Sequence, residues 1–207
     1  PSSSSHALVG GMIGSGVAHA GLTSVKWAGL NKTLIAIVLS PTLGMILAML
    51  IMLLTSWLFK RASSRSAERS FRALHLISSG AYSLSHGLND AQKTMGIITV
   101  LLYSTGYLRG AFEVPHWVAI SCYIAIAAGT LTGGWKIIET MGSRITKLSQ
   151  HQGFSASLGG SIILFGASWL GIPVSTTHTI TGSVIGAGVA RRASAVRWGV
   201  ASNVVVA

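Results

Sequence analysis

Charged side chains, and acidic ones above all, are scarce in this 207-residue sequence. Only 9% of the residues are charged, and four Asp and Glu stand against 15 Lys and Arg. Soluble domains carry about a quarter charged residues, so this composition excludes an ordinary soluble fold. The net charge of +11 does not indicate a nucleic-acid partner, because the basic residues lie in short patches between apolar runs rather than along one face.

Cysteine is almost absent as well. Cys122 is the single cysteine and lies inside an apolar run, where we interpret it as a packing residue. One cysteine cannot form a disulfide or a cysteine metal site within the chain, and we expect no cofactor and no resident metal. The chain begins at Pro1 rather than at a methionine and ends in apolar sequence, which we interpret as a portion of a longer protein.

Three long runs contain no Asp, Glu, Lys or Arg at all: residues 33–59, 114–135 and 152–190. Each is long enough to cross a bilayer core, which takes about 20 apolar residues. The last run is too long for one crossing, and Pro173 lies in its middle, so it should form two segments that meet there. Together with the apolar passage 74–108, these runs predict an all-α, multi-pass protein in the lipid bilayer of the cell's inner (plasma) membrane.

The basic residues predict how these elements are oriented, because cytoplasmic loops are enriched in Lys and Arg. Segment 60–72 carries five of them against one glutamate, so we expect a cytoplasmic loop there. The basic stretches 136–147 and 191–197 should lie on the same side of the membrane. The predicted loop separates residues 1–59, the end of a first repeat, from residues 73–207, most of a second repeat that is truncated at its C-terminus.

The evidence for a repeat is a duplicated segment. Residues 1–18 and 173–190 align without a gap and are identical at nine of eighteen positions, among them the pairs Ser3/Ser175 and His6/His178. A repeat of this length is typical of a duplicated transporter half rather than of a solenoid. The loop charges give the two copies opposite orientations, which predicts inverted-topology repeats built from broken helices and helical hairpins, with a substrate site between them.

The duplicated segment has the chemistry of an anion site. Ser and Thr are favoured at helix starts, so one helix should begin near Ser3 and another near Ser175. Free backbone N–H groups and the positive end of the helix dipole at each start favour an oxyanion. Six hydroxyls add further donors: Ser3, Ser4, Ser5, Ser175, Thr176 and Thr177. The alternative is that these small polar residues only allow close helix packing.

The two histidines of the duplicated segment are secondary candidates. His6 and His178 could contact the ligand or carry a proton. A structural, hydrogen-bonded role is the alternative for each of them.

A second motif, in segment 86–96, interrupts the apolar passage and contains Asp90, the only aspartate in the chain. An ionisable residue at membrane depth is costly and indicates function. A carboxylate repels anions, so Asp90 should hold the coupling cation or a proton, while Asn89 donates to the anion and assists the coupling ion. Lys93, one helical turn away, could instead neutralise Asp90 as a structural ion pair, and it is a further site candidate.

Glycines around this motif predict a break in the helix. Gly80, Gly87 and Gly96 lower helix propensity, and an Asn-Asp pair is a favoured helix start. A broken helix would expose backbone groups to an ion, as in many transporters.

Taken together, the sequences HGLNDAQKTMG (86–96) and GIPVSTTHTITGSVIGAGVARR (171–192) resemble the paired signatures of the inorganic phosphate transporter (PiT) family, in particular its bacterial low-affinity members. Leu88 replaces the alanine usual in the first signature, and the first copy of the second signature reads PSSSSH. The resemblance implies uptake of phosphate by alternating access, coupled to H⁺ or Na⁺, with phosphate carried as the free anion or as a metal–phosphate complex.

By the same resemblance, the site comprises Asn89, Asp90 and the hydroxyls of residues 175–177, with those of residues 3–5 as the mirrored half. The family's other Asn-Asp element is absent, so the chain should hold only part of the site. A sulfate permease on the same scaffold, a non-transporting membrane scaffold and an intramembrane hydrolase are the alternatives. We also count a second copy of the protein, in a homo-oligomer, among its candidate partners. The hydrolase is disfavoured because nothing marks one activated serine, so we predict no enzymatic activity.

Overall fold

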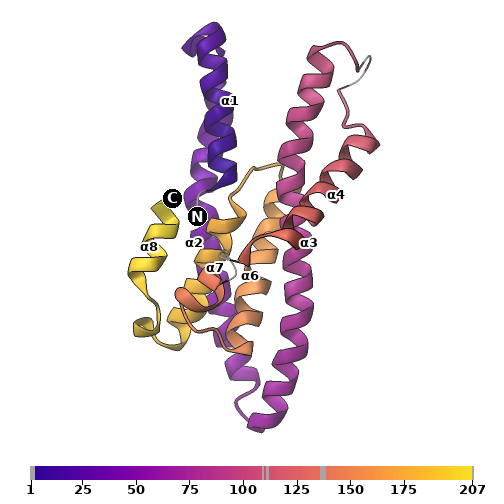
Figure 1. Cartoon of the computed structure of the whole chain (residues 1–207). Coiled ribbons are helices and arrows are strands. Elements are labelled where there is room, and N and C mark those ends of the chain that lie inside the picture. Colours follow the sequence, from indigo (N-terminus) through magenta and orange to yellow (C-terminus); the bar gives the residue numbers. More distant parts are fainter. Residues whose placement is uncertain (1–2, 109, 111, 136–138, 207) are drawn as a thin grey trace.

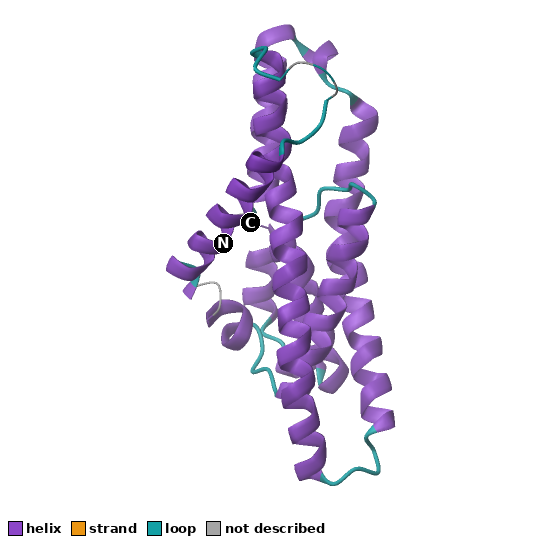
Figure 2. Cartoon of the chain, turned by 90° about the vertical axis from the view of Figure 1, so that its right-hand side faces the viewer, coloured by secondary structure: helices purple, strands orange, loops and turns teal. Residues whose placement is uncertain are grey.

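A computed structural model describes residues 3–108, 110, 112–135 and 139–206, and every regular element in these ranges is helical. Figure 1 shows an elongated bundle of helices, and Figure 2 shows the same bundle turned by 90°. The elements in chain order are α1 (Ser4–Ala20), η1 (Leu22–Ser24), α2 (Trp27–Leu58), α3 (Ser64–Ser104), α4 (His116–Thr132), a π-helical turn η2 (Thr140–Arg144), α6 (Gln150–Trp169), α7 (Thr176–Arg191), η3 (Ala193–Ala195) and α8 (Trp198–Val206).

The two longest helices, α2 and α3, form a hairpin that runs the length of the molecule (Figure 1). The basic segment between them was predicted as a loop over 60–72, and this is wrong for most of its length. Ser63 caps α3 by accepting a hydrogen bond from the backbone N–H of Ser66, so helix begins at Ser64. Residues 136–138 of the second basic stretch lie outside the described residues.

The division of run 152–190 into two helices is confirmed. Helix α6 starts with a capping box between Ser149 and Gln152 and ends at Trp169. The chain then turns at Gly171, whose φ of +64° suits glycine, and α7 starts at Thr176. Pro173 therefore lies in an unwound connection between the two helices, where its missing N–H costs no helical hydrogen bond.

Helix α7 lies in the centre of the bundle, packed against α2 and α6. Glycines bring its backbone close to that of α2. A Cβ on Gly182 would overlap the carbonyl oxygen of Pro41, and a Cβ on Gly186 would overlap that of Met45. Such glycine contacts are typical of helices that associate inside a membrane.

The matching face of α1 is open. The repeat pairs Gly10 with Gly182 and Gly14 with Gly186, yet no described atom lies within 4 Å of a Cβ built on Gly10 or Gly14. Starting from its N-terminus, α1 rises towards the upper end of the molecule, whereas α7 descends from the middle towards the lower end (Figure 1). The two copies of the repeat thus share a sequence but differ in their surroundings.

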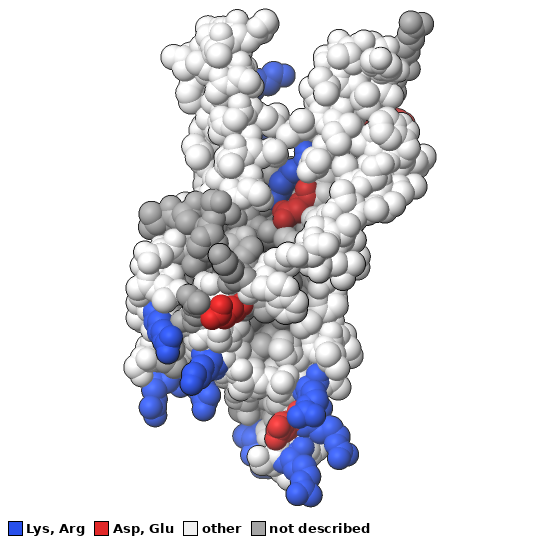
Figure 3. Space-filling model, viewed as in Figure 1, with Lys and Arg blue, Asp and Glu red and all other residues white. Residues whose placement is uncertain are grey.

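The surface of the bundle matches a lipid environment. Apolar side chains of α2 are exposed, such as Val38 at 69% and Ile35 at 63%. Figure 3 shows the Lys and Arg side chains gathered mainly at the lower end of the molecule, with one pair of opposite charges in a hollow nearer the top. By length and hydropathy, α2 alone among the described helices qualifies as able to cross a membrane, and α4 is apolar but shorter.

Candidate functional site

The two copies of the duplicated segment meet at their helix starts. Ser3 is the N-cap of α1 and accepts a hydrogen bond from the backbone N–H of His6 at 3.4 Å. Ser175 is the N-cap of α7 and accepts one from the backbone N–H of His178, also at 3.4 Å. The hydroxyl of Ser3 donates to that of Ser175 at 3.0 Å. We call this meeting point the cap junction; both serines are buried, and the predicted helix starts are confirmed.

The two predicted histidines lie beside the cap junction. The rings of His6 and His178 are tilted against each other, with centroids 4.8 Å apart. Nε2 of His6 is buried and has no hydrogen-bond partner among the described residues. The histidines therefore pack together where the two helices start.

The Asn-Asp motif lies in the middle of α3, and the predicted helix break is wrong. Helix α3 continues without interruption from Ser64 to Ser104. The polar side chains that could have capped a new helix have other partners: Asn89 donates to Ser168 of α6, and Asp90 pairs with Lys93. Close packing of α3 against α6 outweighs the roughly 1 kcal/mol that each interior glycine costs.

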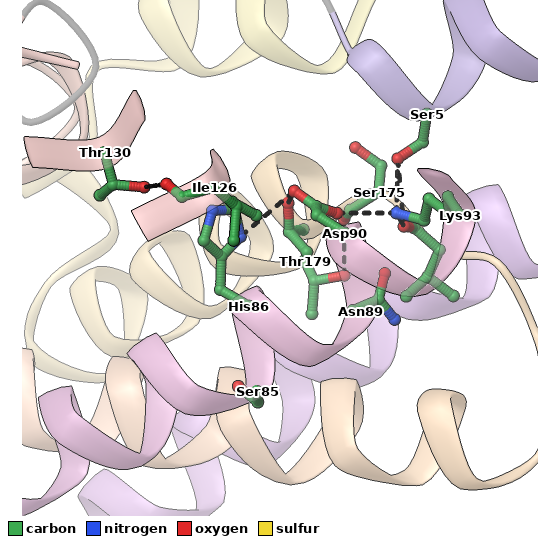
Figure 4. Close-up of polar contacts among 12 residues, drawn as sticks. Ser5, Ser85, His86, Asn89, Asp90, Lys93, Ile126, Thr130, Ser175 and Thr179 are labelled. Carbon is green, nitrogen blue, oxygen red and sulfur yellow. Dashed lines mark hydrogen bonds and ion pairs between the residues drawn. The ribbon is translucent and has the colours of Figure 1, made fainter. Parts of the chain in front are cut away.

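Asp90 connects α3 with the start of α7 (Figure 4). Its Oδ1 accepts a hydrogen bond from Lys93 Nζ at 2.8 Å, and its Oδ2 accepts one from the hydroxyl of Thr176 at 3.2 Å. Nδ1 of His86, one turn earlier in α3, lies 3.4 Å from Oδ2. The ion pair proposed from the sequence as an alternative role for Lys93 is therefore present.

Lys93 reaches past Asp90 to two further elements. Its Nζ donates to the hydroxyl of Ser5 in α1 at 2.7 Å and to the backbone carbonyl of Val174 at 2.7 Å. Figure 4 shows Lys93 between Asp90 and Ser5. The ammonium group thus joins α3, α1 and the connection that precedes α7.

Asn89 does not reach the cap junction. Its side chain is 2% exposed and its amide donates to Ser168 Oγ at 3.2 Å, whereas its Oδ1 is buried without a partner among the described residues. In this arrangement Asn89 supports the site from the α6 side, and its unpaired oxygen is available to a donor or a cation.

Two cavities flank the Asp90–Thr176 contact. One, of about 490 Å³, is lined by Ser4, Ser5, Asp90 and Lys93 together with residues of α4. The other, of about 480 Å³, is lined by residues that include His86, Thr176 and Thr177. Six of the predicted site residues therefore line the two cavities, with Asp90 facing one and bonded to the wall of the other, whereas the cap serines Ser3 and Ser175 line neither.

Sequence analysis missed three supporting residues. His86 precedes Asp90 by four positions, a spacing that places both on one helix face and could have identified it. Tyr82 donates to the backbone carbonyl of Thr176 at 3.4 Å, and Ser168 holds Asn89. Their partners lie 94 and 79 residues away in the chain, so no local pattern indicates these contacts.

The arrangement suits an oxyanion held next to a cation. Two helix starts supply the positive ends of their dipoles and the Ser175 hydroxyl, the Lys93 ammonium supplies a positive charge, and one carboxylate supplies a counter-charge. No group of three or more His, Cys, Asp or Glu side chains that could hold a metal ion occurs within the described residues.

Replacing Ser175 with alanine should weaken this site. The substitution removes the cap of α7 and the hydroxyl partner of Ser3, and loss of an N-cap typically costs about 1 kcal/mol. Since 1.4 kcal/mol corresponds to a factor of ten, we expect the full-length protein to bind an oxyanion about fivefold more weakly, measured as its apparent affinity in uptake assays. Ser15→Ala is the control, since that exposed serine only donates to Met12 of its own helix. Equal affinities of the two variants would contradict the prediction.

Comparison with known proteins identifies relatives along the whole chain. A family model described as "Phosphate transporter family" matches residues 1–65 and 59–207. A "Probable low-affinity inorganic phosphate transporter" of Rhizobium meliloti (strain 1021) is 61% identical over 207 residues, and one of Bacillus subtilis (strain 168) is 38% identical over 206 residues. Each alignment covers 100% of this chain and 62% of the relative, so the chain spans less than two thirds of their length.

A solved structure has the same fold. It is described as "The sodium-dependent phosphate transporter", superposes with a TM-score of 0.83 and is 26% identical in sequence. The match covers 100% of this chain and 68% of that one. The all-helical architecture is thus that of a membrane transporter.

Proposed function

Because the chain belongs to the phosphate transporter family, we propose that the full-length protein takes up inorganic phosphate across the inner (plasma) membrane as a secondary active symporter. The named relatives are transporters and permeases, and an enzymatic role is set aside. The observation that carries the proposal is the cap junction, where two helix starts and their hydroxyls converge within hydrogen-bonding distance. Such a group of donors suits a tetrahedral oxyanion.

Phosphate binds, in this proposal, where the hydroxyls of residues 3–5 and 175–177 surround the cap junction. Lys93 adds a positive charge at its edge, and Asn89 supports the wall behind it. The part of the full-length protein outside this chain completes the site. Both the free anion and a neutral metal–phosphate complex could use these oxygens and hydroxyls, the metal then being part of the cargo.

Alternating access follows from two opposed repeats. Helices α1 and α7 begin at one point and run in opposite directions, which supports an inverted-topology pair around a central substrate. In this arrangement rocking of one repeat against the other exposes the cap junction first to one side of the membrane and then to the other.

The coupling ion is Na⁺ or H⁺. The similar solved structure is described as that of a sodium-dependent transporter, which favours Na⁺. Nδ1 of His86 lies 3.4 Å from Asp90 Oδ2, which favours a proton shared between the two side chains. Uptake of labelled phosphate into proteoliposomes, driven in turn by a sodium gradient and by a proton gradient, separates the two. The gradient that does not couple should leave uptake at its basal level.

Sulfate is the competing substrate, since it offers the same tetrahedral oxygens. We expect unlabelled phosphate to suppress uptake of labelled phosphate at least tenfold more strongly than sulfate does, because at neutral pH phosphate carries O–H groups that can donate to an acceptor such as the Asp90 carboxylate beside Thr176. The measurement is competition in proteoliposomes that hold the full-length protein. Stronger competition by sulfate would overturn the choice of substrate.

A further inference from the structure

The ammonium of Lys93 lies inside a shell of three oxygens that come from three different elements. Ser5 Oγ of α1 and the Val174 carbonyl each lie 2.7 Å from Nζ, and Asp90 Oδ1 of α3 lies 2.8 Å from it. The side chain is only 12% exposed. We call these three oxygens the Lys93 shell.

The Lys93 shell has the composition of an alkali-cation site. Hard cations take carboxylate, hydroxyl and carbonyl oxygens as ligands, and unwound backbone carbonyls in transporters coordinate Na⁺. The Val174 carbonyl belongs to the unwound connection between α6 and α7. An ammonium ion carries the same single charge and has three donors for three acceptors.

A simple structural ion pair does not account for this arrangement. A pairing of Asp90 with a lysine three positions later needs no partner from another helix. Here the ammonium also donates hydrogen bonds to the Ser5 hydroxyl of α1 and to the Val174 carbonyl beside the start of α7, both next to the cap junction. Lys93 therefore holds together the elements that a bound cation would hold.

We infer that Lys93 Nζ takes the place of a co-transported sodium ion in the Lys93 shell, so that this part of the site does not require sodium. The inference rests on the proposed transport function. It follows that removal of the lysine side chain leaves a partly buried carboxylate, a hydroxyl and a carbonyl without a cation. The adjoining cavity of about 490 Å³, lined by Asp90 and Ser5, gives an ion access to them.

The test replaces Lys93 with serine in the full-length protein, so that the shell gains room for an ion and a further hydroxyl. Initial rates of phosphate uptake into proteoliposomes are measured in sodium and in choline at the same proton gradient. We expect the sodium-to-choline ratio of the variant to exceed that of the wild type by about tenfold or more. Lys93→Arg keeps the charge and Lys32→Ser changes an exposed lysine, and both should keep the wild-type ratio.

A second measurement does not depend on transport. With Na⁺ at about 100 times its dissociation constant, sodium in place of choline should raise the Tm of purified Lys93→Ser by about 5 °C more than that of the wild type, because the ion binds only the folded site. The inference is overturned if sodium affects the variant and the wild type equally in both measurements. Absence of phosphate uptake by the wild type would instead overturn the proposed function, and the Tm comparison would still decide the role of Lys93.

Discussion

Replacing Asp90 with asparagine should reduce phosphate uptake by the full-length protein at least a hundredfold. The carboxylate accepts hydrogen bonds from Lys93 and Thr176, and its side chain is 19% exposed. Removing one partner of this partly buried ion pair should cost about 3 kcal/mol, the lower end of the range for buried pairs, because the other charge is left uncompensated. At 1.4 kcal/mol for each factor of ten, that loss corresponds to a hundredfold or more in a binding or transport step. The measurement is the initial rate of labelled phosphate uptake in proteoliposomes.

The matched control is Glu68→Gln. Glu68 is also a helical carboxylate in an ion pair, but it is 67% exposed and lies 3.8 Å from Arg72, and exposed pairs contribute about 0–1 kcal/mol. Its loss should change uptake less than about twofold. To separate misfolding from loss of function, the double variant Asp90→Asn/Lys93→Met removes both charges; it should recover thermal stability and still lack uptake. Normal uptake by Asp90→Asn would favour the scaffold alternative.

Replacing Gly182 with alanine should destabilise the protein by about 3 kcal/mol or more. The new Cβ would overlap the Pro41 carbonyl oxygen and lie 2.7 Å from the carbonyl carbon. These are backbone atoms that cannot rotate away, so α7 and α2 must separate along the best-packed interface of the bundle. A fall of the Tm by several degrees in the purified full-length protein is the expected result.

Gly160 of α6 provides a matched control whose neighbours lie within the described residues. It is buried like Gly182, but a Cβ there would lie 3.3 Å from a ring carbon of Tyr82 and 3.4 Å from a side-chain carbon of Ile180, which are side-chain rather than backbone atoms. Gly160→Ala should therefore lower the Tm much less than Gly182→Ala does, because these side chains can shift by a few tenths of an ångström. Equal losses in the two variants would contradict the explanation of the Gly182 effect by its contact with Pro41.

The features that could be predicted from the sequence are those with local causes. Ser3 and Ser175 mark helix starts because an N-cap depends on residues within three positions of it. The split of the long apolar run follows from Pro173, which cannot continue a helix. The duplication also indicated that the two starts belong together, and the Ser3–Ser175 hydrogen bond joins them.

Contacts between segments that are distant in the chain could not be predicted from the sequence. The predicted break near Asn89 fails because its amide has a partner in α6, 79 residues away, and so does not need to cap a new helix. The reach of Lys93 to Ser5 and Val174 depends on where α1 and α7 lie relative to α3. The sequence shows only that Lys93 follows Asp90 by three positions. This spacing indicates the contact with Asp90, but not those with Ser5 and Val174.

Either of the two cap serines can act as the donor of the hydrogen bond that joins them. A hydroxyl both donates and accepts, so the bond from Ser3 to Ser175 can reverse by rotation of two O–H groups without any movement of the helices. When Ser3 donates, the hydroxyl hydrogen of Ser175 is left for a ligand, and when Ser175 donates, the hydrogen of Ser3 is left. The pair can therefore present the same single donor to either side of the junction, and a ligand that leaves one serine for the other meets equivalent chemistry.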